Sequence, residues 1–186
     1  MYQMSKYFIF IPNLLSIVRI GLIYPILNNI LLSNFLISLG YFLIASLTDA
    51  LDGFLARKMN WQTYLGTILD PVADKILLSG TILFLWFNSY IPLYIFVIFI
   101  GRDVAILLGA AVHMTLMESE TPLPNILGKL TTGLQIAYIV IVFIFEIFNI
   151  TTSLLLLDIF IIIVTLLSLF VYAKNWFSSL NKYHNE

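Results

Sequence analysis

Four aspartates stand close together in a chain that is otherwise poor in charged residues. Asp49 and Asp52 are three positions apart, and Asp70 and Asp74 are four positions apart. Both spacings put the two members of a pair on one face of a helix. Carboxylates gathered in a small space repel one another, and divalent cations that prefer oxygen ligands compensate this charge. The pattern therefore predicts a site for two Mg²⁺, Mn²⁺ or Ca²⁺ ions, an arrangement that promotes displacement at phosphorus.

Small residues and one arginine accompany the aspartates. Gly53 and Ala56 share a helix face, and Gly66 precedes the second acidic pair. Small residues let helices approach closely, or leave room for a ligand against the backbone. Arg57 can neutralise a phosphate group through a forked contact. The segment thus offers space and positive charge beside its carboxylates.

The helices that carry this segment are expected to lie in a membrane. Of the 186 residues, 61% are hydrophobic and only 10% are charged, whereas a soluble domain carries about a quarter charged residues. We expect an all-α, polytopic bundle of six transmembrane helices, forming a single domain over residues 1–186. Residues 1–10 are compatible with a short interfacial helix and equally with a frayed terminus. Six stretches reach the roughly 20 apolar residues that span a bilayer: 11–32, 35–56, 68–88, 91–113, 127–148 and 152–174.

Basic residues in the loops predict the orientation of these helices. Three of the connections between the six stretches contain no lysine or arginine. The basic residues near the remaining ends are Lys6, Arg57, Lys58, Lys129, Lys174 and Lys182. Because positive loops stay in the cytoplasm, both termini and the four aspartates are expected on the cytoplasmic side.

Any one of the four carboxylates has an ordinary structural explanation. Asp70 precedes Pro71 and is suited to cap a helix, and another aspartate could form a buried ion pair with Arg57 or Lys75. The whole set is harder to explain in this way, because an ionisable residue within a spanning segment costs a few kcal/mol or more. We therefore expect the four aspartates to act together.

The complete motif resembles the signature of a known family of membrane enzymes. Its eight positions read Asp49-x2-Asp52-Gly53-x2-Ala56-Arg57-x8-Gly66-x3-Asp70-x3-Asp74. This run is similar to the signature of the CDP-alcohol phosphatidyltransferases, with every position filled. Further segments resemble the bacterial glycerophospholipid branch of that family: Ile11 to Arg19, Asp70 to Lys75, Arg102-Asp103 and Gly128-Lys129. The resemblance implies an enzyme of phospholipid synthesis that transfers the phosphatidyl group of CDP-diacylglycerol to an alcohol and releases CMP.

The resemblance also implies a role for each position of the motif. Two divalent ions, Mg²⁺ or Mn²⁺, would be bound by Asp49, Asp52, Asp70 and Asp74. Asp74 would also be the general base that deprotonates the acceptor hydroxyl. The residues that would line the CDP site are Gly53, Ala56, Arg57 and Gly66. A homodimer surrounded by membrane lipids, in a bacterial inner membrane, is further implied.

The acceptor alcohol has to be recognised outside the motif. Arg102 lies deep in the fourth apolar stretch, and its guanidinium suits a phosphate, so we expect it to bind the acceptor phosphate with Lys75 and Lys129. The alternative is that Arg102 pairs with Asp103. Glycerol 3-phosphate, giving phosphatidylglycerophosphate, and phosphatidylglycerol, giving cardiolipin, are both compatible with the sequence. By comparison with the family pattern, the absence of a further cation over residues 104–110 favours the second, whereas the short chain and the run from Gly128 to Thr132 suit the first just as well, so both stay open. Inositol phosphate and serine are less favoured.

Two other classes of protein also place carboxylates in a membrane. A cation transporter would scatter them near the bilayer midplane, often on broken helices, whereas here they gather at one predicted interface beside Arg57. An inactive scaffold should have lost at least one of the four aspartates. The net charge of −1 gives no basic footprint for nucleic acid. Because the chain has no cysteine, disulfides and cysteine-based zinc sites are excluded.

Overall fold

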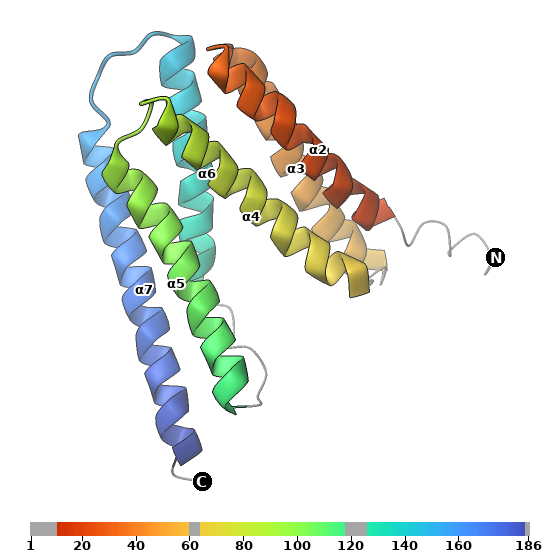
Figure 1. Ribbon diagram of the computed structural model, residues 1–186, viewed down its shortest axis with the longest axis vertical. Helices are drawn as coiled ribbons and strands as arrows, with labels where there is room; N and C mark the ends of the chain where they lie inside the picture. Colours follow the sequence, from red (N-terminus) through yellow and green to blue (C-terminus); the bar gives the residue numbers. More distant parts are fainter. Residues whose placement is uncertain (1–10, 60–63, 118–125, 185–186) are drawn as a thin grey trace, which may run out of the picture. The chain divides into compact units, whose positions relative to one another are not determined.

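The protein is built from helices throughout the part of the chain that its computed structural model describes, residues 11–59, 64–117 and 126–184 (Figure 1). No strand occurs within these ranges, so the predicted all-α class is confirmed. The six apolar stretches correspond one by one to the six described helices. These are α2 (Ile11–Leu31), α3 (Phe35–Met59), α4 (Tyr64–Phe87), α5 (Leu93–Met117), α6 (Ile126–Ile147) and α7 (Leu155–His184).

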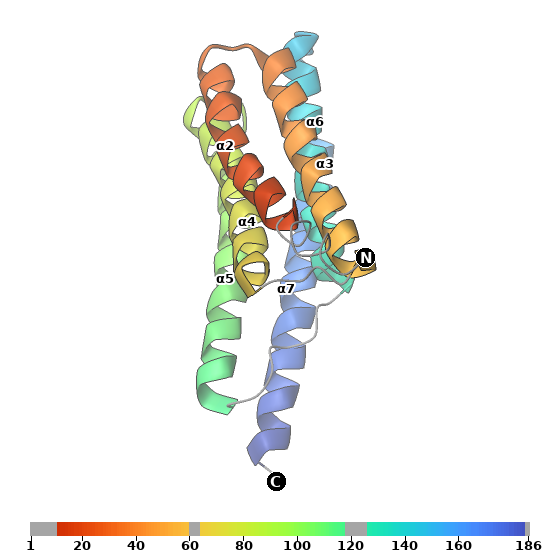
Figure 2. The same ribbon diagram turned by 90° about the vertical axis from the view of Figure 1, so that its right-hand side faces the viewer.

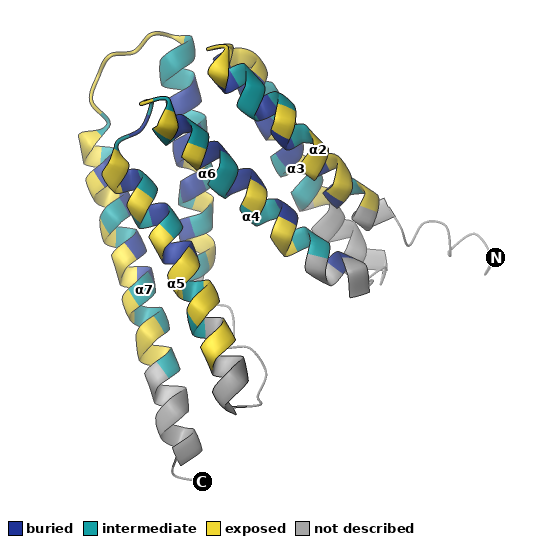
Figure 3. Ribbon diagram, viewed as in Figure 1, coloured by how far each residue is buried: buried dark blue, intermediate teal, exposed yellow. Residues whose placement is uncertain are grey.

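Three helices are long and apolar enough over their described residues to cross a membrane. On α7, large apolar side chains such as Leu156 and Phe170 are exposed, and exposed positions recur along each helix (Figure 3). This pattern fits helices whose outer faces contact lipid rather than water. The crossing segments are Leu14–Leu31, Leu127–Ile147 and Leu155–Trp176. The chain is therefore an integral membrane protein, while six spans remain a prediction and residues 1–10 lie outside the described part.

The chain divides into two compact units. The first unit contains α2, α3, α4 and the segment Ile139–Ile150, which begins in the second half of α6. Within it, α2 packs against both α3 and α4 and lies between them (Figure 2). Phe42 of α3 and Phe143 of α6 meet edge to face in its core, with ring centroids 6.0 Å apart. The predicted single domain over residues 1–186 stays a prediction.

Three helices of the first unit end with the same backbone device. Ser33, Ser89 and Asn149, which follow α2, α4 and α6, have positive φ angles of 58°, 64° and 51°. In each case the N–H of this residue bonds the carbonyl three positions back, and the next N–H bonds the carbonyl five positions back. These are Schellman endings, which satisfy the last carbonyls of a helix and turn the chain sharply. They form the short connections at the end of the unit remote from the aspartates.

The second unit contains α5, the segment up to Tyr138 of α6, and α7. Phe99 and Tyr138 pack edge to face with centroids 5.7 Å apart. At the start of α5 and α7, the Tyr94 hydroxyl donates to the buried carboxylate of Asp158 at 2.6 Å. Further along, α5 and α7 approach closely at Gly109, where an added Cβ would lie 2.9 Å from the ring of Tyr172.

We expect Gly109→Ala to destabilise the protein by about 1–2 kcal/mol, because overpacking against Tyr172 outweighs the better helix propensity of alanine. The Tyr172 ring cannot swing away freely, since its hydroxyl donates to the Ile106 carbonyl at 3.3 Å. Gly101→Ala is the matched control on the same helix, because a Cβ there meets nothing within 4 Å. Thermal unfolding in detergent should show a lower midpoint for Gly109→Ala only. A common shift in both variants would contradict the close contact.

Candidate active site

The motif aspartates lie where the helical spacing predicted them. Asp49 is in α3, and Asp70 and Asp74 are in α4 one turn apart. Gly66 is buried near the start of α4. Four further motif positions fall in the last turns of α3, and their side chains are outside the described part of the structure: Asp52, Gly53, Ala56 and Arg57. Their assigned roles in binding metal or CDP therefore stay predictions.

The centre of the site is an arginine from a third helix. Arg19 of α2 is completely buried. Its Nη1 atom lies 3.1 Å from Oδ1 of Asp49 and also donates to Oδ1 of Asp74. The two carboxylates are partly open to the surroundings, with 46% and 38% of their side chains exposed. One guanidinium nitrogen thus joins an aspartate of α3 to an aspartate of α4.

A second residue of α2 completes this arrangement. The hydroxyl of Ser16, which is also fully buried, donates to Oδ1 of Asp70. Ser16 and Arg19 are three residues apart, so both project from the same face of α2. The position of α2 between α3 and α4 follows from these contacts, because a buried arginine in an apolar helix requires nearby negative charge. The acidic site is therefore formed by α2 together with α3 and α4.

This role of α2 was not predicted from the sequence. The acidic pairs were expected to face each other directly across the α3–α4 connection, whereas Arg19 lies between Asp49 and Asp74. Residues 11–19 entered only through the family resemblance. The available signal was the charge itself, because Arg19 is the only Asp, Glu, Lys, Arg or His in the sequence between positions 11 and 48.

Two of the predicted metal ligands carry oxygen atoms of the kind that divalent cations prefer. Within the described residues, no group of three or more Asp, Glu or His side chains lies close enough to hold a metal ion. Two predicted ligands, Asp49 and Asp74, nevertheless converge on one positively charged atom. Their oxygens are the hard ligands that Mg²⁺ and Mn²⁺ prefer. The carboxylates are thus arranged around a cation, and in this structure the cation is the guanidinium of Arg19.

Two of the three residues expected to bind the acceptor, Arg102 and Lys129, belong to the second unit. Arg102 is buried and donates from Nη1 to Asp103 at 2.6 Å and from Nη2 to the Gly128 carbonyl at 3.0 Å. Lys129 follows Gly128 directly and is exposed. The ion pair with Asp103 is the contact that the alternative explanation of Arg102 requires. Lys75 belongs to the first unit, so its expected cooperation with Arg102 stays a prediction.

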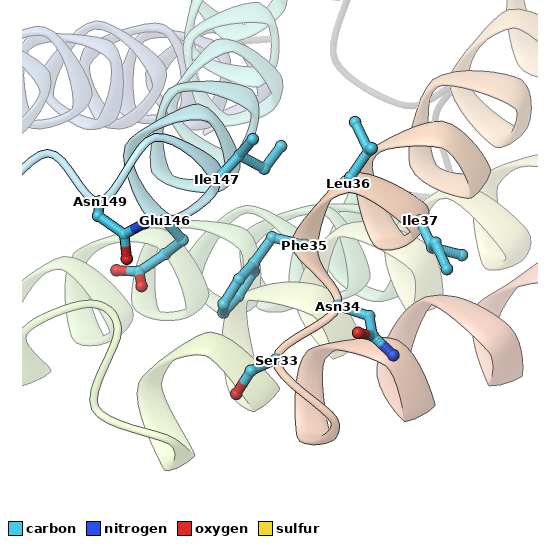
Figure 4. A pocket seen from close by; sticks show the side chains of 8 residues that line it. All are labelled: Ser33, Asn34, Phe35, Leu36, Ile37, Glu146, Ile147 and Asn149. Atoms are coloured by element: carbon cyan, nitrogen blue, oxygen red, sulfur yellow. The ribbon is translucent and has the colours of Figure 1, made fainter.

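A separate pocket lies at the opposite end of α2 from Arg19. It has a volume of about 450 Å³ and is formed around the connection between α2 and α3, with Glu146 and Asn149 on another side (Figure 4). None of the predicted site residues lines it. Glu146 is therefore a suitable position for control variants in the experiments below.

Comparison with known families shows to which family the chain belongs. The sequence model of the CDP-alcohol phosphatidyltransferases matches residues 9–177, which is most of the chain. The chain belongs to the CDP-alcohol phosphatidyltransferase family. The resemblance drawn from the motif is thereby confirmed, and with it the class of enzyme, a transferase. Enzymes of this family generally depend on divalent metal ions, which agrees with the carboxylates around Arg19.

Characterised relatives within the family carry two different names. The chain is 42% identical over 124 residues to the CDP-diacylglycerol–glycerol-3-phosphate 3-phosphatidyltransferase of Aquifex aeolicus, covering 66% of this chain and 68% of the relative. The enzyme of that name from Bacillus subtilis is 34% identical over 143 residues, covering 68% and 72%. The CMP-forming cardiolipin synthase of Rattus norvegicus is 43% identical over 114 residues, 60% of this chain but only 37% of the relative. This chain therefore spans little more than a third of the cardiolipin synthase.

Proposed function

We propose that this CDP-alcohol phosphatidyltransferase transfers the phosphatidyl group of CDP-diacylglycerol to a glycerol-type acceptor and releases CMP. The observation that carries the proposal is the convergence of Asp49 and Asp74 on a single cation, within a complete family motif. The names of the relatives support CDP-diacylglycerol as the donor. They include enzymes for glycerol 3-phosphate and cardiolipin synthases, so both acceptors remain in the proposal.

Separate residues of the site are assigned to metal binding, proton transfer and nucleotide binding in this reaction. Asp49, Asp52, Asp70 and Asp74 would hold two divalent ions, which when bound supply charge stabilisation at the diphosphate. Asp74 accepts the proton of the acceptor hydroxyl. The acceptor oxygen then forms a bond to the phosphorus that carries diacylglycerol, while the bond from that phosphorus to the bridging oxygen breaks and CMP leaves. Gly53, Ala56, Arg57 and Gly66 would accommodate the cytidine diphosphate.

The acceptor phosphate is assigned to the second unit. Arg102 is held by Asp103 and by the Gly128 carbonyl, which brings it to the first turn of α6 beside Lys129. An arginine already oriented by two contacts loses little conformational freedom when it binds a phosphate. The exposed ammonium of Lys129 adds a second positive charge. Lys75 is proposed as the third positively charged residue that binds this phosphate.

We further propose that all six described helices cross the membrane. The helices α3, α4 and α5 have 25, 24 and 25 residues, which corresponds to about 36 Å and exceeds the roughly 30 Å of a hydrocarbon core. The loop charges support a cytoplasmic position for the aspartates and both termini. The diacylglycerol chains then stay in the bilayer while the nucleotide is reached from the cytoplasm. Assembly as a homodimer stays a prediction.

The proposal is tested by the release of CMP from CDP-diacylglycerol. Purified protein with Mg²⁺ or Mn²⁺ is given glycerol 3-phosphate, phosphatidylglycerol, inositol phosphate or serine in separate reactions, and both CMP and the lipid product are measured. We expect CMP with one of the first two acceptors, and loss of activity when the metal is chelated. Absence of CMP with every acceptor would overturn the proposal, as would full activity with EDTA. The Glu146→Gln variant is expected to match the wild type.

A further inference from the structure

Two carboxylates of the acidic site share a counter-charge on α2. Asp49 and Asp74 are two carboxylates that both reach Nη1 of Arg19. The guanidinium offsets the repulsion between these two carboxylates and orients both toward one point, the position to which ligands of a metal would also have to point.

A divalent ion and the guanidinium compete for the same oxygens. An ion bound to Asp49 and Asp74 would have to stand close to the place that Nη1 now holds, since both carboxylates are directed there. Two positive charges so close together repel strongly, even when the effective dielectric constant is intermediate. Binding of the metal at these two carboxylates thus requires the guanidinium to withdraw from at least one of them.

A withdrawn guanidinium needs another negatively charged partner. Arg19 is completely buried, so it cannot turn into water. If the four motif aspartates hold two dications, their negative charge is already neutralised. The positive charge of Arg19 then has to be balanced by another anion. The diphosphate of the donor is the anion that enters this site under the proposed function, and a guanidinium suits phosphate oxygens.

We propose that Arg19 is an exchangeable counter-cation that couples metal binding to nucleotide binding. Its guanidinium pairs with Asp49 and Asp74, yields them to a metal ion that binds these carboxylates, and moves to the diphosphate of the CDP-linked donor. Metal and nucleotide therefore favour each other's binding, and by linkage the effect is equal in both directions. This inference rests on the proposed function for the identity of the nucleotide, but not for the exchange between arginine and metal.

The exchange is tested by titrating the purified enzyme with Mn²⁺ and following the free ion by electron paramagnetic resonance, without and with CDP. Arg19→Gln removes the competing charge, so it should bind Mn²⁺ about ten-fold more tightly than the wild type without CDP. The tightening of Mn²⁺ binding by CDP should be about ten-fold smaller in this variant. A purely structural arginine predicts the opposite, because loss of its contacts would disorder Asp49 and Asp74 and weaken metal binding.

Two further variants separate the charge of Arg19 from its contacts. Arg19→Lys keeps the positive charge, and its Mn²⁺ affinity should stay within about three-fold of the wild type. Glu146→Gln, at the remote pocket, should change neither titration. Weaker or unchanged Mn²⁺ binding by Arg19→Gln would overturn the proposal, as would retention of its full response to CDP.

The folding of the Arg19→Gln variant also tests whether Arg19 acts as a counter-charge. If the variant is folded only when Mn²⁺ or Mg²⁺ is present during purification, the metal has replaced the missing counter-charge, as proposed. If neither ion restores folding, Arg19 is structural and the proposal fails. The titrations require no turnover and no acceptor. Tighter Mn²⁺ binding by Arg19→Gln together with no CMP release by the wild type would therefore reject the proposed function alone.

Discussion

Replacing Asp74 with asparagine is expected to lower the rate of CMP release by about a thousand-fold. Asparagine keeps the shape of the side chain but cannot accept the proton of the acceptor hydroxyl, and loss of a general base typically costs about 10²- to 10⁴-fold. It also removes the charge that Asp74 shares with Asp49 around Arg19. The measurement is the initial rate of CMP release at saturating CDP-diacylglycerol, acceptor and metal.

Asp49→Asn distinguishes the base from a metal ligand. Asp49 contacts the same nitrogen of Arg19 as Asp74 does, so both variants remove one charge from the same place. We expect a higher Mn²⁺ concentration to recover part of the activity of Asp49→Asn, because only metal affinity is lost. The activity of Asp74→Asn should not recover. If Asp74→Asn keeps more than about a tenth of the wild-type rate, Asp74 is a counter-ion of Arg19 and not the base.

The acidic half of the site could be predicted because local spacing determines it. Asp70 and Asp74 are one helical turn apart whatever the tertiary structure, and the apolar stretches correspond to the observed helices because length and hydropathy define them. The family motif then supplied the chemistry. All of this information is contained in short segments of the chain.

The contribution of α2 could not be predicted in this way, because it depends on which helices become neighbours. Arg19 is 30 positions from Asp49 and 55 from Asp74, and no spacing rule connects such distances. The buried charge showed that a partner must exist, but it did not identify the partner. The same applies to Ser16 and Asp70. The sequence therefore predicted the acidic residues of the site, whose role as metal ligands stays a prediction, whereas the arginine between Asp49 and Asp74 had to be found in the structure.

Arg102 presents a different case, in which the sequence posed two alternatives and the structure shows the contact that one of them requires. Its contact with Asp103 at 2.6 Å supports a structural ion pair. Its contact with the Gly128 carbonyl joins it to the residue that precedes Lys129, and its binding of an acceptor phosphate stays a prediction. Asp103 is buried together with Arg102, so the pair stabilises unit two whether or not a phosphate binds. Only the dependence of the kinetics on the acceptor can separate these explanations.

Arg102→Ala is expected to raise the KM for the acceptor by about 10- to 100-fold, because hydrogen bonds to a charged group contribute about 1.5–3 kcal/mol. The KM for CDP-diacylglycerol should change by less than about three-fold, since the donor is assigned to the motif in unit one. Steady-state kinetics with each substrate varied in turn measures both constants. Equal changes in the two constants would leave Arg102 as the partner of Asp103 alone.

The phosphate of the acceptor provides the decisive control for Arg102. With glycerol in place of glycerol 3-phosphate, the wild type and Arg102→Ala should differ little, because the group that Arg102 binds has been removed from the substrate. Arg102→Lys keeps the charge without the fork and should show an intermediate KM. Gly128→Val tests the same contact from the other side, because a Cβ at this position already lies 3.4 Å from Nη2 of Arg102. We expect the added γ carbons of valine to crowd the guanidinium, so this variant should raise the acceptor KM while Asp103 and Arg102 are both still present.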